Sequence, residues 1–201
     1  MKSKAEQTTE FIIEKVAPVF NKKGYTATSL SDLEEATGLT KGAIYGNFES
    51  KEDLAVKAFQ YNFKKVNQWL YDFMIKGKNP TEKLFLMTEF YRNYYDFMVD
   101  FGGCPIINVT IDAKNINPTL YALGCFEAKK MEGKLAKIIQ MGMDSKEFRE
   151  NLNAEQTAKV LYTMIDGSIL MAFSHLDKTY LDSMMDFVDN YIRERIIQPA
   201  I

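Results

Sequence analysis

The sequence is poor in the residues from which metal centres, nucleophilic active sites and disulfide scaffolds are built. Among 201 residues, His175 is the only histidine, and Cys104 and Cys125 are the only cysteines. A single histidine excludes a multi-histidine metal site and a histidine-paired nucleophile with a spare histidine. Two cysteines outside any CxxC pair are too few for a secreted disulfide scaffold and fit a reducing compartment. Because no Gly-rich phosphate loop or HExxH motif occurs either, we expect no enzyme activity, no metal and no cofactor.

Long apolar runs and a basic excess are also missing. No segment reaches the roughly 18 apolar residues of a membrane span, and charged residues interrupt any signal-peptide pattern among the first twenty positions. We therefore expect a cytoplasmic protein with no membrane partner. The 25 Lys and Arg residues are balanced by 27 Asp and Glu residues, so the total charge of -2 does not by itself indicate a nucleic-acid partner.

Apolar residues at helical spacing are abundant. Hydrophobic residues make up 46% of the chain, enough for this length to bury a core without disulfide or metal support. Between the glycines and prolines that punctuate the sequence, apolar residues recur every three or four positions, as in Ala55, Phe59, Phe63, Val66 and Leu70. No strand pattern of comparable strength occurs, and the prediction is an all-α protein.

Residues 28–47 have the pattern of a helix-turn-helix. Ser29 and Asp32 form a potential capping box for a short helix that ends near Gly38, and Thr40 can cap the helix that follows. Two short helices joined by a glycine-containing turn are typical of a DNA-binding motif. Similar hairpins also occur in proteins that never bind DNA.

The residues around this motif are more specific than the pattern. They comprise a Gly-Tyr-Thr-Ala-Thr-Ser opening, a Gly-Leu-Thr-Lys-Gly turn, an Ile-Tyr-x-x-Phe recognition helix and a Ser-Lys-Glu-Asp-Leu start to the next helix. Over about residues 8–60 the sequence resembles the DNA-binding domain of TetR-family transcriptional regulators. The resemblance implies a three-helix DNA-binding domain at residues 1–48, from which a fourth helix beginning at residue 50 leads into the next domain. Residues 49–201 would then form a larger helical effector-binding and dimerisation domain.

The resemblance also implies which residues contact DNA. Gly42 would let the recognition helix approach the major groove closely, while Ile44 and Phe48 hold that helix on the other two. Contacts to phosphates or base edges are expected from Ser29, Thr40, Lys41, Gly42, Tyr45, Asn47 and Lys51. Three alternatives stay open: Tyr45 can join two helices, Lys51 can be a solvated charge, and Asn47 can end a helix instead of reading an adenine.

The predicted head is electrically neutral. Residues 1–48 contain six lysines and six acidic residues, so DNA binding requires the positive charges to share one face. Lys2, Lys4, Lys41 and Lys51 are the candidates for that face. Since each neutralised phosphate contributes about 0.9 to the logarithmic salt slope, few such contacts predict a shallow salt dependence.

The middle of the chain is rich in aromatic residues and methionine, which suit a pocket for a small hydrophobic or aromatic effector. The resemblance implies such a pocket, and the predicted lining is Phe63, Phe90, Tyr91, Tyr94, Met98, Cys104 and Phe126. The alternative is that these side chains simply fill the core. For Cys104, a buried or pocket-lining thiol is favoured over a redox sensor, because no basic group lies nearby in sequence.

The last two predicted helices, about 153–173 and 181–197, are each apolar on two sides, and a helix of that kind needs two surfaces to pack against. One surface is the protein's own core and the other is a second copy across a two-fold axis, although a thick monomer core is the alternative. The predicted interface residues are Val160, Met164, Gly167, Met171, Met185, Ile192 and Ile196. Asp166, inside the first of these helices, is expected to cap or to pair across the dimer and not to catalyse.

The sequence thus predicts a homodimeric, TetR-like transcriptional regulator. We expect it to bind a double-stranded DNA operator and to act as a repressor that a small hydrophobic or aromatic effector releases. The alternative is a helical ligand-binding or protein-interaction module that has lost specific DNA reading.

Overall fold

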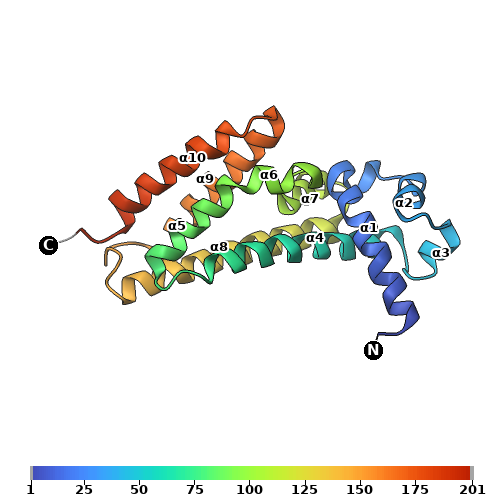
Figure 1. The fold of residues 1–201 in the computed structure, drawn as a ribbon, viewed down its shortest axis with the longest axis horizontal. Coiled ribbons are helices and arrows are strands. Elements are labelled where there is room, and N and C mark those ends of the chain that lie inside the picture. Colours follow the sequence, from blue (N-terminus) through green and yellow to red (C-terminus); the bar gives the residue numbers. More distant parts are fainter. Residues whose placement is uncertain (1, 200–201) are drawn as a thin grey trace. The chain divides into compact units, whose positions relative to one another are not determined.

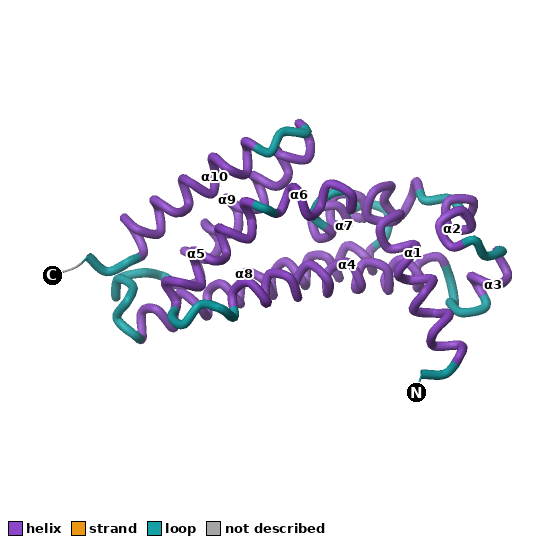
Figure 2. The backbone as a smooth tube through the Cα atoms, viewed as in Figure 1, coloured by secondary structure: helices purple, strands orange, loops and turns teal. Residues whose placement is uncertain are grey.

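The computed structural model describes residues 2–199, and these are built from helices (Figures 1 and 2). The α-helices are α1 (Lys4–Ala27), α2 (Leu30–Thr37), α3 (Lys41–Tyr45), α4 (Lys51–Met74), α5 (Pro80–Arg92), α6 (Tyr94–Met98), α7 (Pro105–Ala113), α8 (Pro118–Asp144), α9 (Ala154–His175) and α10 (Thr179–Tyr191). A short 3-10 helix, η1 (Val99–Phe101), follows α6, and a π-helical turn, η2 (Ile192–Ile196), follows α10. The described residues contain no strand beyond an isolated antiparallel bridge between Phe148 and Ile197, so the all-α prediction is confirmed.

Several of the helices begin at short polar side chains that cap them. Ser29 and Asp32 form a complete capping box at the start of α2, with the Ser29 hydroxyl accepting from the Asp32 amide at 3.2 Å. The side chains of Asn117 and Asn153 accept from backbone amides at 2.9 Å and begin α8 and α9. Local side-chain chemistry thus sets where these helices begin. None of the described helices combines the length and apolar character that crossing a bilayer requires.

The chain divides into two compact units. Unit 1 comprises the residues up to Val66 together with Phe101–Cys125, and unit 2 comprises Asn67–Asp100 together with the residues from Phe126 onward. Both α4 and α8 contribute residues to each unit. Because α7 joins the N-terminal helices in unit 1, this division differs in kind from the predicted domain boundary after residue 48, which remains a prediction.

Unit 1 holds the three N-terminal helices around a small apolar core. Ile12, Val16, Leu33, Ile44 and Phe48 are buried there, which confirms that the third helix is anchored through its inward side chains. Helical dihedrals in α1 stop at Gly24, whose φ of 78° lies in the left-handed region that favours glycine.

A hydrogen-bonded contact between α1 and α7 extends this core. The Asp112 carboxylate accepts from the Tyr25 amide at 2.6 Å and lies 2.8 Å from where a Cβ atom of Gly24 would stand. The Asn21 side chain donates to the carbonyls of Phe101 and Gly103 at 2.6 and 3.0 Å. These bonds fix the end of α1 against the residues that enter α7.

Unit 2 is built on the packing of α5, α9 and α10. A buried stripe runs along α10 and η2 through Leu181, Met185, Val188, Ile192 and Ile196. Met185, Ile192 and Ile196 are fully buried inside the protomer, so their prediction as dimer-interface residues is corrected to core residues. The physical reason is that they continue the stripe of Leu181 and Val188 at helical spacing and therefore face the same side.

Candidate DNA-binding head and ligand cavity

The recognition helix α3 presents a nearly bare surface to solvent. Thr40 precedes it and accepts from the Ala43 amide at 3.4 Å, which caps the helix as predicted. Gly42 and Ala43 are exposed, and no atom lies within 4 Å of where a Gly42 Cβ would stand. A helix with small residues on its outer side can bring its backbone close to base edges and phosphates.

Lys41 and Tyr45 flank this bare surface. The Lys41 side chain is exposed, and its backbone amide donates to the Glu34 carboxylate at 2.8 Å. Tyr45 is half-buried, and burial raises the pKa of its phenol above the ordinary value. Since a half-buried tyrosine both packs and keeps one side accessible, its two predicted roles are compatible.

Lys51 lies against an aromatic ring. Its Nζ stands 4.8 Å from the centre of the Tyr25 ring, a cation–π distance. Partial burial lowers the pKa of its ammonium group, and the charges of Asp112 and Asp32 oppose that shift. The position is therefore more organised than a freely solvated first-turn lysine.

Ser29 and Asn47 already have partners within the head. The Ser29 hydroxyl donates to the Asp32 carboxylate at 2.8 Å, and Lys23 approaches the same carboxylate at 2.6 Å. Asn47 donates to the Ala43 carbonyl at 2.8 Å and accepts from the Thr9 hydroxyl at 3.2 Å. In this arrangement Asn47 ends α3 and ties it to α1, so reading a base would require both bonds to break.

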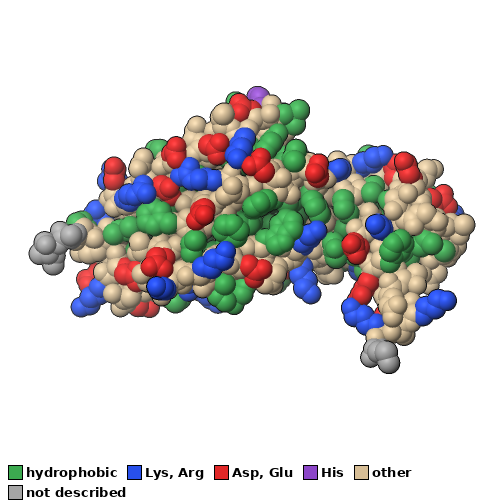
Figure 3. All heavy atoms as spheres, in the orientation of Figure 1, with side chains coloured by type: hydrophobic (Ala, Val, Ile, Leu, Met, Phe, Trp, Pro, Cys, Tyr) green, Lys and Arg blue, Asp and Glu red, His purple; other side chains and the backbone are tan. Residues whose placement is uncertain are grey.

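Charges of both signs mix across the head. Two acidic side chains, Asp32 and Glu34, accept hydrogen bonds from backbone amides at the beginnings of α2 and α3. Lys2 pairs with Glu10 at 2.5 Å, which leaves Lys4 and Lys41 as exposed lysines of the predicted basic face without a carboxylate partner in the part of the chain that is described. In the view of Figure 3 the basic and acidic side chains over this region are interspersed.

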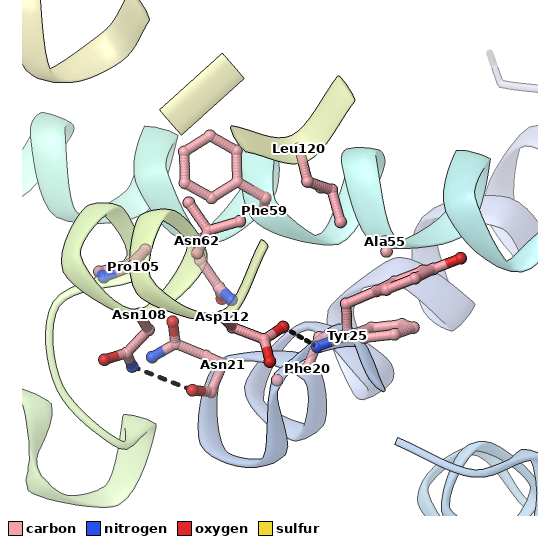
Figure 4. A pocket seen from close by; sticks show the side chains of 12 residues that line it. Phe20, Asn21, Tyr25, Ala55, Phe59, Asn62, Pro105, Asn108, Asp112 and Leu120 are labelled. Atoms are coloured by element: carbon pink, nitrogen blue, oxygen red, sulfur yellow. Dashed lines mark hydrogen bonds between the residues drawn. The ribbon is translucent and has the colours of Figure 1, made fainter. Parts of the chain in front are cut away.

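Unit 1 also contains a small cavity between α1, α4, α7 and the start of α8, lined by apolar side chains and a few polar ones. Figure 4 shows Asn21, Asn62, Asn108 and Asp112 converging beside Phe20 and Phe59, with the Asp112–Tyr25 and Asn108–Asn21 hydrogen bonds crossing it. Its volume is about 30 Å³. A space of that size is far below the range of about 300–1,000 Å³ that holds small-molecule ligands.

Unit 2 contains a much larger cavity of about 410 Å³. The C-terminal half of α4 supplies Leu70 and Met74, α5 supplies Met87 and Tyr91, and α8 supplies Leu135 among others. The volume and apolar lining fall within the range of small-molecule sites.

Of the seven predicted pocket residues, Tyr91 lines this cavity. Phe90, Tyr94 and Met98 are buried core residues that do not line it. Phe63 and Cys104 belong to unit 1, and Phe126 is 60% exposed on α8. These six do not line the cavity of unit 2, and their assignment to an effector site stays a prediction, because a helical aromatic stripe marks a buried face but does not say which part of that face stays unfilled.

Sequence reasoning missed most of the cavity lining. The apolar stripe of α8 through Met131, Leu135 and Ile138 was recognisable as a buried face, yet its neighbours across the cavity come from α4, α5 and α9. The three lysines of the lining, Lys83, Lys134 and Lys137, gave no signal because lysine on a helix normally indicates a solvated surface.

Asp166 on α9 is largely buried. Burial raises the pKa of its carboxyl group to about 6, the charge of Glu132 acts in the same direction, and a hydrogen bond from the Tyr162 hydroxyl opposes the shift. The prediction that it pairs across a dimer remains a prediction. The described residues contain no cluster of three or more metal-ligating side chains.

The outer sides of α9 and α10 expose large apolar side chains. Leu170 is 42% exposed and Phe187 is 56% exposed, with Met171 close to the same level. Of the predicted interface residues, Gly167 and Met171 are exposed, and Val160 and Met164 are half-buried. These four lie on α9 and share its outer face.

Comparison with known proteins matches an N-terminal and a C-terminal region of the chain to one family. Residues 12–58 match the family model described as bacterial regulatory proteins of the tetR family, and residues 80–188 match the tetracyclin repressor-like C-terminal domain. A solved TetR-family transcriptional regulator from Cytophaga hutchinsonii is 34% identical with a TM-score of 0.91, covering 99% of this chain and 100% of that chain.

Two curated relatives also match over nearly their full length. The uncharacterised HTH-type transcriptional regulator YxaF of Bacillus subtilis is 25% identical over 92% of this chain and 95% of its own. The HTH-type transcriptional repressor DhaR of a Mycobacterium species is 23% identical over 89% of each chain. With a helix-turn-helix head, an all-helical C-terminal region and these matches, the chain belongs to the TetR family of bacterial transcriptional regulators.

Proposed function

We propose that this regulator is a repressor whose α3 enters the major groove of an operator and whose affinity for DNA falls when a small effector fills the cavity of unit 2. The observation that carries the DNA-binding part is the bare outer side of α3. Gly42 and Ala43 are exposed there, while Ile44 is buried beneath them. A buried anchor under small outer residues positions a backbone for close approach to DNA.

Within this proposal the seven predicted DNA-contacting residues divide by what they already contact. Lys41, Tyr45 and the backbone at Gly42 are free to meet the groove, and Thr40 offers its capping hydroxyl beside them. Lys51 reaches a phosphate by leaving the Tyr25 ring. Ser29 and Asn47 act mainly within the head, through the hydrogen bonds described above. Residues 1–48 serve as the DNA-binding domain and 49–201 as the effector-binding and dimerisation domain.

The repressor role is supported by the name of the relative DhaR, a transcriptional repressor. Release by an effector is supported by the course of α4. This helix starts at Lys51, directly after the recognition helix, and ends with residues that line the large cavity. A ligand that changes the position of Leu70 and Met74 therefore acts on the helix that follows the head. The coupling works only if the ligand binds one arrangement of the dimer more tightly than the other.

Homodimerisation through the last two helices completes the proposal. Leu170 and Met171 on α9 and Phe187 on α10 are exposed apolar side chains, and Gly167 on α9 leaves room for a partner helix to approach closely. Such a surface is more stable when a second copy covers it. Two heads related by a two-fold axis would then reach successive major grooves about 34–36 Å apart.

The test is a mobility-shift titration with the promoter DNA beside the protein's own gene, compared with an unrelated fragment of equal length. We expect retardation of the promoter fragment by the dimer and a loss of affinity in Lys41→Ala, whereas Lys129→Ala, an exposed lysine of α8, binds like wild type. Absence of retardation at low salt, with the dimer present, would favour the alternative of a ligand-binding or interaction module without DNA reading.

A further inference from the structure

The cavity of unit 2 has a charge of one sign in its lining. Lys83, Lys134 and Lys137 contribute to it, and none of the described lining residues is acidic. We infer that the effector is an amphipathic anion: an apolar body with one carboxylate or a similar anionic group that pairs with Lys134. This inference rests on the proposed function, since it specifies the ligand class of the proposed effector site.

The lysines of the lining lack the partners that other lysines of unit 2 have. Lys130 pairs with Glu127 at 3.1 Å, and Lys178 pairs with Asp96 at 2.7 Å. Within the described residues, neither Lys83 nor Lys134 nor Lys137 forms an ion pair with a carboxylate. Lys134 and Lys137 are exposed and Lys83 is half-buried, so an anionic ligand in this cavity can reach three ammonium groups that no carboxylate already occupies in an ion pair.

Lys134 is the best placed of the three to bind an anionic group. Its Nζ donates to the neutral side-chain oxygen of Asn67 at 2.8 Å, which orients the ammonium group without neutralising it. Partial burial, and then the charge of Lys130, lower the pKa of Lys134 below its ordinary value, and the charge of Glu127 opposes them. Both causes disfavour the charged form, so an anion beside Lys134 relieves them, and charge-assisted hydrogen bonds are the stronger kind.

The rest of the lining accepts an apolar body. Leu70, Met87, Leu135 and Ile165 come from four different helices and face the same space of about 410 Å³. That volume lies in the range of cavities that hold small organic ligands. A small inorganic anion would leave these side chains uncovered, and a quaternary ammonium ligand would meet three lysines. The combined lining therefore selects a ligand with an apolar part and an anionic end.

Three ligands of equal chain length separate these possibilities: decanoate, decanol and decyltrimethylammonium. Their affinities for the full-length dimer are measured by isothermal titration calorimetry at pH 7.5, below their micellar concentrations. We expect decanoate to bind at least about tenfold more tightly than decanol, because a hydrogen bond to a charged group contributes more than a neutral one. Decyltrimethylammonium should bind most weakly.

The variant Lys134→Gln keeps the length and polarity of the side chain but removes its charge. It should weaken decanoate binding about tenfold and leave decanol binding unchanged. Lys129→Gln on the same helix is the matched control, since Lys129 is exposed and does not line the cavity, and it should change neither affinity.

Two outcomes would overturn the inference. Decanol or the cation binding as tightly as decanoate means that the cavity does not select an anion, and equal losses for decanoate and decanol in Lys134→Gln mean that Lys134 acts through structure alone. The proposed function is judged separately, by adding each ligand to the protein–promoter complex. Selective binding of decanoate without release of DNA contradicts the effector mechanism but not the ligand class, whereas loss of promoter binding by the ligand-free protein contradicts only the DNA-binding proposal.

Discussion

Replacing Asp166 by asparagine should stabilise the protein at neutral pH. Burial raises the pKa of this carboxyl group from 3.8 to about 6, so the folded protein binds its proton more tightly than the unfolded chain does. At 1.36 kcal/mol per pKa unit, the ionised carboxylate costs the folded state up to about 3 kcal/mol. Asparagine has nearly the same shape and its side-chain oxygen can still accept from Tyr162, so the expected gain after burying its amide group is about 1 to 3 kcal/mol.

The sign of the pH dependence follows from the direction of this shift. Because the folded pKa is raised, the penalty is absent below about pH 4, grows between about pH 4 and 6, and is constant above that window. Urea unfolding of wild type and Asp166→Asn, at one protein concentration and at pH 4 and 7.5, measures the difference. The variant should be more stable at pH 7.5, and the difference should shrink toward zero at pH 4.

The matched control is Glu89→Gln, which neutralises an exposed carboxylate of the same unit and should change stability by less than about 0.5 kcal/mol at either pH. If Asp166→Asn is no more stable than wild type at pH 7.5, the carboxylate is not paying a burial penalty. A cation from a partner subunit beside Asp166 would produce that result by stabilising the ionised carboxylate in the folded dimer.

Three further predictions concern packing, salt and the head. Gly142→Ala should lower the free energy of unfolding by about 1 to 3 kcal/mol in urea, because the buried Phe148 ring occupies the space of the new methyl group. Gly133→Ala on the same helix has open space around it and should raise the free energy of unfolding by up to about 1 kcal/mol. Equal effects of the two substitutions would contradict the packing of Phe148 against Gly142. The logarithm of operator affinity should fall with the logarithm of salt concentration at a shallow slope, and Lys41→Ala should reduce that slope by about 0.9 per protomer. A dependence on the tenth power of salt concentration would show that the head makes more phosphate contacts than its few lysines allow. Asn47→Ala removes the hydrogen bonds to Ala43 and Thr9 and should lower the free energy of unfolding by about 1 to 2 kcal/mol. The preferred operator sequence should not change. An altered base preference in a binding-site selection would show that Asn47 reads DNA.

The parts of the fold that depend on local chemistry were predictable from the sequence. Ser29, Thr40 and Asn117 each sit three residues before the amide that they cap, and such caps act within a few residues of chain. The recognition helix was equally predictable, because Ile44 is its inward apolar residue, the small residues Gly42 and Ala43 lie on its outer side, and the apolar Phe48 follows shortly after the helix ends.

The assignment of apolar faces was less predictable, since helical periodicity identifies a buried face but not the partner that buries it. Along α10 and η2 the residues Leu181, Met185, Val188 and Ile192 form one buried stripe, while Phe187 on another side of α10 is exposed. The sequence pattern predicted two separate apolar faces here, so Met185 and Ile192 were wrongly assigned to the dimer interface.

The cavity was least predictable, because its existence depends on volumes left between four helices. Phe90 and Tyr94 are buried and do not line the cavity, whereas Leu70 and Leu135 are equally buried and do line it. No property of one helix distinguishes these cases, and the lysines of the lining become meaningful only once the helices are assembled.

The central claim is that a dimer of this chain reads DNA through two copies of α3, and DNase footprinting on its own promoter region tests it most directly. We expect a protected, nearly palindromic site whose two halves lie one helical turn apart, about 10 base pairs from centre to centre, with protection lost in Lys41→Ala. Uniform or absent protection at low salt, or protection that Lys41→Ala leaves unchanged, would contradict it.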